Sequence, residues 1–84
     1  MLSGCLESNP ETYQYEDGST FKLFNDGTFI IHFTENNKTF SGNYKENSGY
    51  LYLNYPIGYT ETFLKIESSI WVDKDGWRWE RVSN

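Results

Sequence analysis

The sequence predicts an all-β domain, an antiparallel up-and-down meander of six to seven short strands that forms a strongly twisted sheet or a small closed barrel. Turn signals recur about every 8–12 residues, a spacing that is typical of sheets, sandwiches and barrels. The runs between these turns are rich in β-branched and aromatic residues, which favour strands. No window places apolar residues at helical spacing over three turns.

The first half of the chain contains the clearest hairpin signal. Expected strands cover Tyr13–Glu16, Thr20–Phe24 and Thr28–Thr34, separated by the turns Asp17-Gly18 and Asn25-Asp26-Gly27. An Asp-Gly pair between two apolar runs is the strongest short-range indication of a hairpin. We therefore expect a positive φ at Gly27 and one shared apolar face, made of Phe21, Leu23, Phe29 and Ile31.

The second half continues with short β-rich runs that are cut by polar turns. These runs are Thr39–Lys45, Tyr50–Tyr55, Tyr59–Glu67, Ile70–Val72 and Trp77–Val82. Within the third of them, Phe63, Leu64 and Ile66 do not fit one face of a strand, which predicts a β-bulge. Because a barrel needs about eight strands before its interior can hold even a small ligand, we expect side chains to fill the inside.

Composition limits the chain to one domain with a small core. It has 84 residues, and a domain of this size buries only about 60% of the surface that its unfolded chain exposes. Three Trp, seven Tyr and six Phe compensate, since each ring buries on the order of 150–250 Å². With a single cysteine and no expected metal cluster, these rings must supply most of the stability.

The charge of the chain excludes some partners. The formal net charge is −5, whereas nucleic-acid binders carry basic patches that neutralise phosphates. The same charge disfavours adsorption to anionic headgroups. No stretch approaches the roughly 20 apolar residues of a transmembrane helix, so we expect no nucleic-acid partner and membrane contact only through a lipid.

Leu2-Ser3-Gly4-Cys5 indicates where that lipid would be attached. Small residues beside the scissile bond, an apolar residue further back and a cysteine that forms a thioether match a lipobox, the cleavage site of a prokaryotic lipoprotein signal peptide. The alternative is a chance cysteine in a frayed terminus. The motif predicts an extracytoplasmic domain, anchored to the cell membrane through lipid on Cys5. The polar segment Leu6–Thr12 would be the tether, so that residues 1–12 precede a β domain of residues 13–84.

The pattern of turns and core positions resembles small β-meander or lipocalin-like domains of uncharacterised prokaryotic lipoproteins and secreted proteins. The resemblance covers about Phe21 to Val82 and rests on Asp26-Gly27-Thr28-Phe29, Gly42-x-Tyr44, Leu51-x-Leu53, Thr60-x-Thr62-Phe63 and Asp73-x-Asp75-Gly76. It departs from their pattern at Leu64, which looks like an extra residue. These are turn and core residues, so the resemblance implies a fold and export, and it carries over no catalytic residue.

Catalysis and metal binding find little support in the sequence. His32 is the only histidine and lies within a strand, where a solvated or cross-strand-paired role is expected; a nucleophile with its base and orienting group is not evident. Asp73-x-Asp75-Gly76 faintly resembles a calcium loop, but its Gly comes too early, and a hairpin turn explains the motif equally well. We expect no enzyme activity, no cofactor and no metal site.

Aromatic pairs are the best remaining candidates for a binding surface. Trp77 and Trp79 share one face of a strand, and Tyr50 and Tyr52 form a similar pair that could stack sugar rings or hold a peptide. The alternative is that these rings only pack the sheet, as cross-strand aromatic pairs do. Asn37 begins an Asn-Lys-Thr glycosylation pattern in a loop, and its occupancy is open.

The resulting functional hypothesis is a non-enzymatic cell-surface module that binds a protein or glycan partner through an edge strand or an aromatic patch. The alternative is a small-ligand carrier of miniature lipocalin type, which requires an apolar cavity of about 300–1,000 Å³. An exposed row of Trp and Tyr would favour the first hypothesis.

Overall fold

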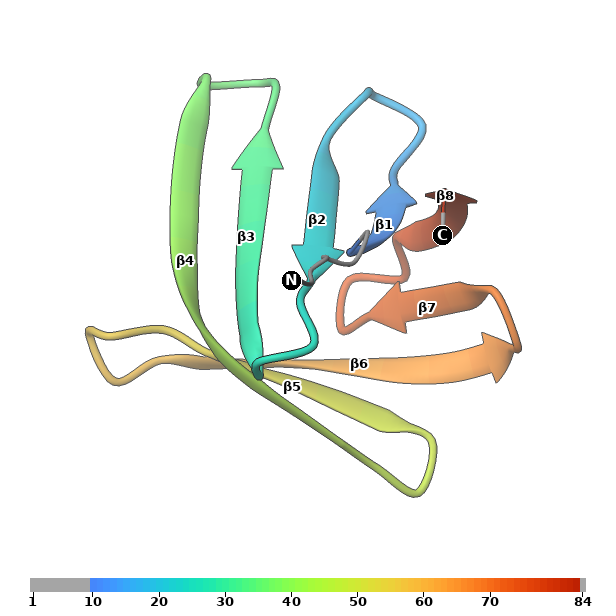
Figure 1. The fold of residues 1–84 in the computed structure, drawn as a ribbon. Coiled ribbons are helices and arrows are strands. Elements are labelled where there is room, and N and C mark those ends of the chain that lie inside the picture. Colours follow the sequence, from blue (N-terminus) through green and yellow to red (C-terminus); the bar gives the residue numbers. More distant parts are fainter. Residues whose placement is uncertain (1–9, 84) are drawn as a thin grey trace, which may run out of the picture.

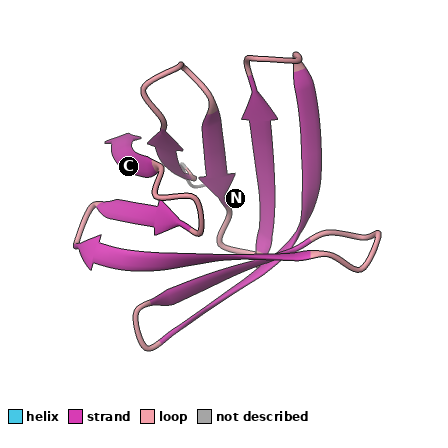
Figure 2. Cartoon of the chain, turned by 180° about the vertical axis from the view of Figure 1, so that it is seen from behind, coloured by secondary structure: helices cyan, strands magenta, loops and turns pink. Residues whose placement is uncertain are grey.

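The computed structural model describes residues 10–83, which form eight antiparallel strands and no helix (Figures 1 and 2). Each strand pairs with the next, and the last pairs with the first, so the meander closes into a barrel. The strands are β1 (Glu11–Gln14), β2 (Thr20–Leu23), β3 (Thr28–Phe33), β4 (Lys38–Asn47), β5 (Tyr50–Asn54), β6 (Thr60–Glu67), β7 (Ile70–Asp73) and β8 (Arg78–Ser83). The all-β antiparallel class is confirmed. The expected count of six to seven strands is corrected to eight, because the weak first run and the short seventh run both form ladders with two neighbours.

The first strand begins earlier than the sequence indicated. Glu11 and Thr12 pair with Leu23 and Lys22 of β2, so these two residues belong to the barrel and not to the expected tether. The pairing brings Tyr13 into the core, where it is 1% exposed. Cys5 and the rest of the lipobox lie outside the described residues.

The β2–β3 hairpin confirms the strongest local prediction. Gly27 has a φ of 90°, and the N–H of Thr28 donates to Oδ1 of Asp26 at 3.0 Å. The register places Phe21 opposite Ile31 and Leu23 opposite Phe29, all of them buried. The Asp-Gly turn therefore sets the register, as this dipeptide does in tight hairpins.

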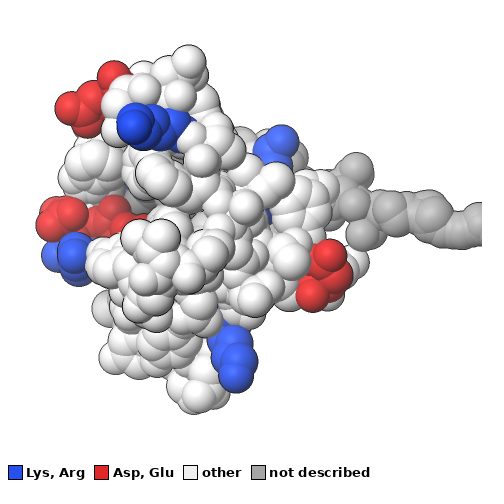
Figure 3. Space-filling view, turned by 90° about the vertical axis from the view of Figure 1, so that its left-hand side faces the viewer, with Lys and Arg blue, Asp and Glu red and all other residues white. Residues whose placement is uncertain are grey.

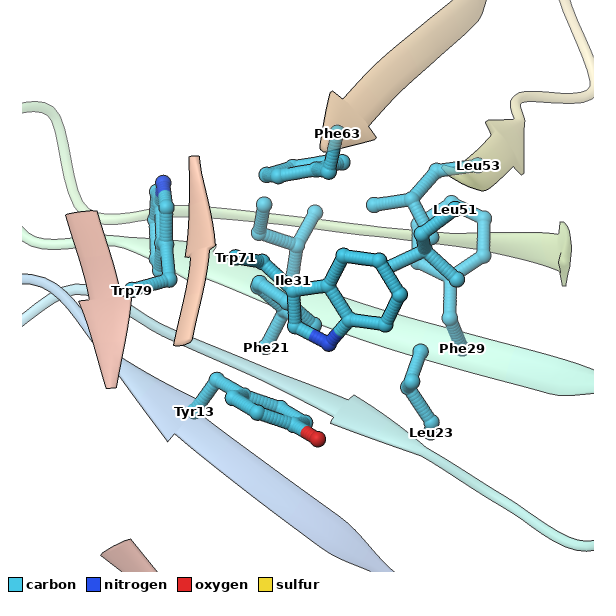
Figure 4. Packing of buried hydrophobic residues seen from close by; sticks show 10 residues of the cluster. All are labelled: Tyr13, Phe21, Leu23, Phe29, Ile31, Leu51, Leu53, Phe63, Trp71 and Trp79. Carbon is cyan, nitrogen blue, oxygen red and sulfur yellow. The ribbon is translucent and has the colours of Figure 1, made fainter. Parts of the chain in front are cut away.

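The barrel interior is filled by apolar side chains from both halves of the chain (Figure 4). The ring of Phe21 lies 5.2 Å from that of Phe63 and 5.3 Å from that of Trp79, in tilted arrangements. Every member of the cluster is at most 3% exposed: Tyr13, Phe21, Leu23, Phe29, Ile31, Leu51, Leu53, Phe63, Trp71 and Trp79. The expectation that side chains fill the inside is confirmed, although eight strands surround them.

The longest strand, β4, joins two halves of the barrel whose strands run in different directions. Its first half pairs with β3 and its second half with β5, and Figure 1 shows it bending between them. Gly42 lies at this bend, opposite Phe29. A Cβ on Gly42 would overlap the carbonyl oxygen of Asn54 and lie 2.9 Å from Cε1 of Phe29. Glycine is needed here because two backbones and a ring approach closely, as is typical of barrel corners.

The bulge expected in the sixth strand is present. The register between β6 and β7 shifts between Lys65 and Glu67. Lys65 pairs with Trp71 on the inner face, and its Nζ lies 5.0 Å from the centroid of that ring and 3.6 Å from Oε2 of Glu46. Lys65 lies before this shift, two residues after Phe63 and on the same face, so its amphipathic side chain covers Trp71 at this end of the barrel.

Candidate functional site

A groove of about 520 Å³ opens on the outside of the barrel where β1 and β8 pair. Because side chains of a strand alternate between its two faces, every second residue of β8 points outward here. We call this feature the seam groove. It is lined by Gln14, Tyr15, Glu16, Gly18, Gly76, Trp77, Arg78, Glu80 and Val82.

Two stacked rings form the rim of the seam groove. The rings of Tyr15 and Trp77 lie 4.2 Å apart with an interplanar angle of 7°, and each residue is half-buried. Behind them Trp79 is fully buried, with its centroid 5.6 Å from Tyr15 and 6.4 Å from Trp77. Each ring of the rim therefore covers one face of the other, and the core supports the stack through Trp79.

Asp73 holds the Trp77 side of the rim in place. Its Oδ1 accepts hydrogen bonds from the N–H groups of Asp75 and Trp77, both at 2.9 Å, and its Oδ2 accepts one from Nε1 of Trp79 at 3.2 Å. Asp73-x-Asp75-Gly76 is thus a hairpin turn, which was one of its two interpretations. Residues 10–83 contain no group of three His, Cys, Asp or Glu residues that could hold a metal ion.

The turn between β1 and β2 holds the Tyr15 side. The N–H of Ser19 donates to Oδ1 of Asp17 at 2.7 Å, and this hydrogen bond is the main reason why the pKa of Asp17 lies below its usual value. The N–H of Tyr15 donates to the carbonyl of Ser19 at 2.8 Å. Both sides of the rim are therefore fixed by hydrogen bonds within their own turns.

The polar side chains of the seam groove have no such commitments. Gln14, Glu16, Arg78 and Glu80 are exposed, and within residues 10–83 none of them forms a side-chain hydrogen bond or an ion pair. Two carboxylates, one amide and one guanidinium therefore line the groove with donors and acceptors that have no partner within residues 10–83. Such an arrangement can orient a polar ligand against the rings.

The structure separates the two tryptophans that the sequence proposed as one binding surface. Trp77 lines the seam groove, but Trp79 is 0% exposed and belongs to the core. The expectation of an exposed Trp77–Trp79 pair is wrong, because both rings pack on the core side of the barrel and only Trp77, which precedes β8 at the turn, reaches the rim. For Trp79, the alternative of sheet packing holds.

The predicted tyrosine pair lies elsewhere on the barrel. Tyr50 and Tyr52 stack on the outer face of β5 with centroids 6.2 Å apart, and Tyr50 is 43% exposed. In the ladder between β5 and β6, Tyr50 lies opposite Leu64. These rings do not line the seam groove, so the proposed binding residues do not form one site.

The other sequence candidates have structural roles or no assigned partner. Nδ1 of His32 lies 2.8 Å from Oγ1 of its cross-strand neighbour Thr39, so of the two roles expected for it, solvated or cross-strand-paired, the structure shows the second. Asn37 has a φ of 54° in the exposed turn before β4. Neither residue contributes to the seam groove.

A second polar cluster lies where β5 and β6 meet. The hydroxyl of Tyr55 donates to Oε1 of Glu61 at 3.0 Å. Burial raises the pKa of both side chains, and the proximity of the Glu61 carboxylate raises that of Tyr55 further. Nζ of Lys74 donates to the hydroxyl of Tyr59 at 3.0 Å, so this cluster is internally paired, in contrast to the seam groove.

Charges elsewhere on the surface are dispersed. In the view from the β4 side, Lys and Arg are scattered among Asp and Glu, with broad uncharged areas between them (Figure 3). This face therefore offers no continuous basic area for a polyanion. Within residues 10–83 there is no helix long and apolar enough to cross a membrane.

Fold and site together define a class: a closed, eight-stranded antiparallel barrel with a packed interior and an external groove at the seam of its first and last strands. Comparisons with protein-family models, curated proteins and solved structures found no match.

Sequence reasoning missed most of the seam groove. Gln14, Tyr15, Glu16, Arg78 and Glu80 carry no motif, and they come from the two ends of the chain. The signal that could have identified them was barrel closure, because only closure brings β1 beside β8. An expected count of eight strands would have suggested it.

Proposed function

We propose that this chain is a non-enzymatic binding module, displayed outside the cell membrane by lipid on Cys5, that holds a protein or glycan partner in the seam groove. The observation that carries the proposal is the combination of a fixed aromatic rim with four polar side chains that form no hydrogen bond or ion pair within residues 10–83. Unpaired polar groups around an apolar surface are the usual composition of a ligand site.

The closed barrel favours side-chain recognition over strand addition. β1 and β8 each pair on both sides, so neither strand offers a free edge to a peptide backbone beside the groove. Of the two recognition modes that the sequence left open, an edge strand or an aromatic patch, the geometry supports the second.

The position of the cavity favours the surface binder over the miniature lipocalin carrier. A carrier needs an apolar cavity inside the barrel, whereas the interior side chains here are at most 3% exposed. The seam groove lies outside and is lined by charged and amide groups as well as rings. A polar or amphipathic partner suits this lining better than an apolar small molecule.

Ligand binding is tested by screening the protein on glycan and peptide arrays with two matched charge deletions. Arg78→Ala removes a groove cation, and Lys22→Ala removes an exposed cation on the outer face of β2 that does not line the groove. At least one ligand should bind the parent and the Lys22 variant equally, and the Arg78 variant more weakly. Ligands that tolerate Arg78→Ala, or no ligand at all, would contradict the proposal.

Membrane anchoring is tested separately with the lipobox. The protein expressed behind a lipoprotein signal sequence should partition into the detergent phase and gain the mass of a lipid. Cys5→Ser should leave it in the aqueous phase. An unmodified parent protein in the aqueous phase would refute the anchored location and would leave the groove untouched.

A further inference from the structure

We infer that the ligand of the seam groove is a glycan and that the rim takes an uncharged pyranose ring. The inference rests on the proposed binding function and adds the chemical class of the ligand. It follows from the rim, from the arrangement of hydrogen-bonding groups, from the charge of the lining and from the volume of the groove.

The rim matches the shape of a sugar ring. A pyranose with equatorial hydroxyls presents C–H bonds on its two faces, and such a face packs on a flat aromatic surface. The rings of Tyr15 and Trp77 stack face to face and are parallel to within 7°, so a sugar would pack on an outward face of the pair. The buried Trp79 and the turn around Asp73 hold the two rings in place. A preorganised surface of this kind loses little conformational entropy when a ligand binds.

The polar groups around the rim match hydroxyls better than they match a peptide. Glu16 and Glu80 accept hydrogen bonds only, Arg78 donates only, and Gln14 does both. A sugar hydroxyl donates and accepts, so it can bond to any of these groups. A peptide that bound by strand addition would need a free strand edge, and the pairing of β1 with β8 uses that edge.

The lining charge selects against acidic sugars. It contains two carboxylates and one guanidinium, and the whole chain carries −5. Carboxylated or sulfated sugars would place further negative charge beside Glu16 and Glu80, which like-charge repulsion disfavours. Uncharged sugars avoid this repulsion and still use every polar group.

The volume of the groove fits a short segment of a chain. About 520 Å³ lies within the range of about 300–1,000 Å³ that small-molecule sites occupy. Because the groove is partly open to solvent, a longer glycan could extend beyond it. One or two rings would be held, with the remainder outside.

The inference is tested by ¹⁵N–¹H NMR titration of the full chain with three probes at equal millimolar concentration. The probes are a β-linked glucose hexamer, a galacturonic acid hexamer and a pool of random octapeptides. The glucose hexamer should shift the indole N–H of Trp77 and the backbone signals of Glu16 and Glu80, and the uronate should bind at least about tenfold more weakly.

Matched variants connect binding to the groove. Trp77→Ala should weaken glucose-hexamer binding about tenfold, whereas Tyr50→Ala, which removes an exposed ring outside the groove, should leave it unchanged. Should Trp77→Ala disturb the β7–β8 turn, Arg78→Ala provides the same test on an exposed strand position. The double change Glu16→Gln with Glu80→Gln should abolish discrimination against the uronate.

The outcomes separate this inference from the binding function on which it rests. Groove shifts with the peptide pool alone, or tighter binding of the uronate, would overturn the glycan inference and keep a ligand site in the groove. Shifts confined to Tyr50 and Tyr52 would overturn both the glycan inference and the binding function of the groove. The same conclusion would follow if no probe caused a shift and no array ligand responded to Arg78→Ala.

Discussion

Substitution of Gly42 by alanine should be among the most damaging single-methyl additions in this barrel. The added Cβ would overlap the carbonyl oxygen of Asn54 and approach Cε1 of Phe29 to 2.9 Å. One of these neighbours is backbone within the β4–β5 ladder, and the other is a ring that is 0% exposed. Neither can move without disturbing the ladder or the core.

The magnitude follows from the cost of overpacking. Forcing extra methylenes into a packed core costs about 1–3 kcal/mol of the free energy of unfolding. Because the added methyl group of Gly42→Ala meets backbone, which cannot move aside, we expect a loss of about 3 kcal/mol. For a domain of this size each kcal/mol shifts Tm by about 4–8 °C, so the midpoint should fall by about 12–24 °C.

Gly27→Ala is the matched control because it adds the same methyl group in open space. Gly27 has a φ of 90° and no atom within 4 Å of an added Cβ, so the substitution costs only backbone strain of about 1–2 kcal/mol. Urea unfolding monitored by tryptophan fluorescence measures both variants. A loss for Gly42→Ala below about 0.5 kcal/mol, the range of an ordinary surface change, would refute the close approach of β4 and β5.

Three further predictions concern the turns and the buried carboxylate. Gly27→Val should cost more than Gly27→Ala in the same urea experiment, because β-branched residues resist a positive φ; equal losses would argue against a tight turn. Asp73→Ala leaves three donors without their acceptor and should lower the free energy of unfolding by on the order of 3 kcal/mol. It should also release Trp77 from its stack with Tyr15, which a red shift of the tryptophan fluorescence would show. Glu61→Gln should raise the urea midpoint at pH 7, and this advantage over the parent should disappear below about pH 4. The pKa of Glu61 is raised in the folded state, so its neutral form stabilises the fold at low pH and that stability is lost as the pH rises through the folded pKa. Glutamine stays neutral at every pH and therefore does not lose it. An advantage that grows on acidification would have the wrong sign for a buried carboxyl.

Local features of the fold were predictable from the sequence, since short-range chemistry determines them. Asp26-Gly27 specified both a positive φ and the register of β2 with β3, because the same two residues form the turn and align its strands. The conflict between Phe63, Leu64 and Ile66 likewise revealed a bulge, since a strand cannot place all three on one face.

Features that depend on closure were not predictable in this way. Thr12 and Tyr13 pair with Ser83 and Arg81 of β8, which comes from the other end of the chain, so no local pattern marks this ladder. The burial of Trp77 and Trp79 also depends on closure. Their rings lie on the same side of the chain, and only Trp77 is close enough to the barrel end to reach the groove. The seam groove joins the two ends of the chain, so no local motif marks it.

The most direct test of the central claim, that the aromatic rim of the seam groove is a ligand-binding surface, is a set of intermolecular NOEs. Isotope-labelled protein would be mixed with the unlabelled glucose hexamer, and contacts between the two would be recorded. We predict NOEs from the ring protons of Tyr15 and Trp77 to the C–H protons of one or two sugar rings. NOEs to Tyr50 and Tyr52 in their place, with silent Tyr15 and Trp77 rings, would contradict the account.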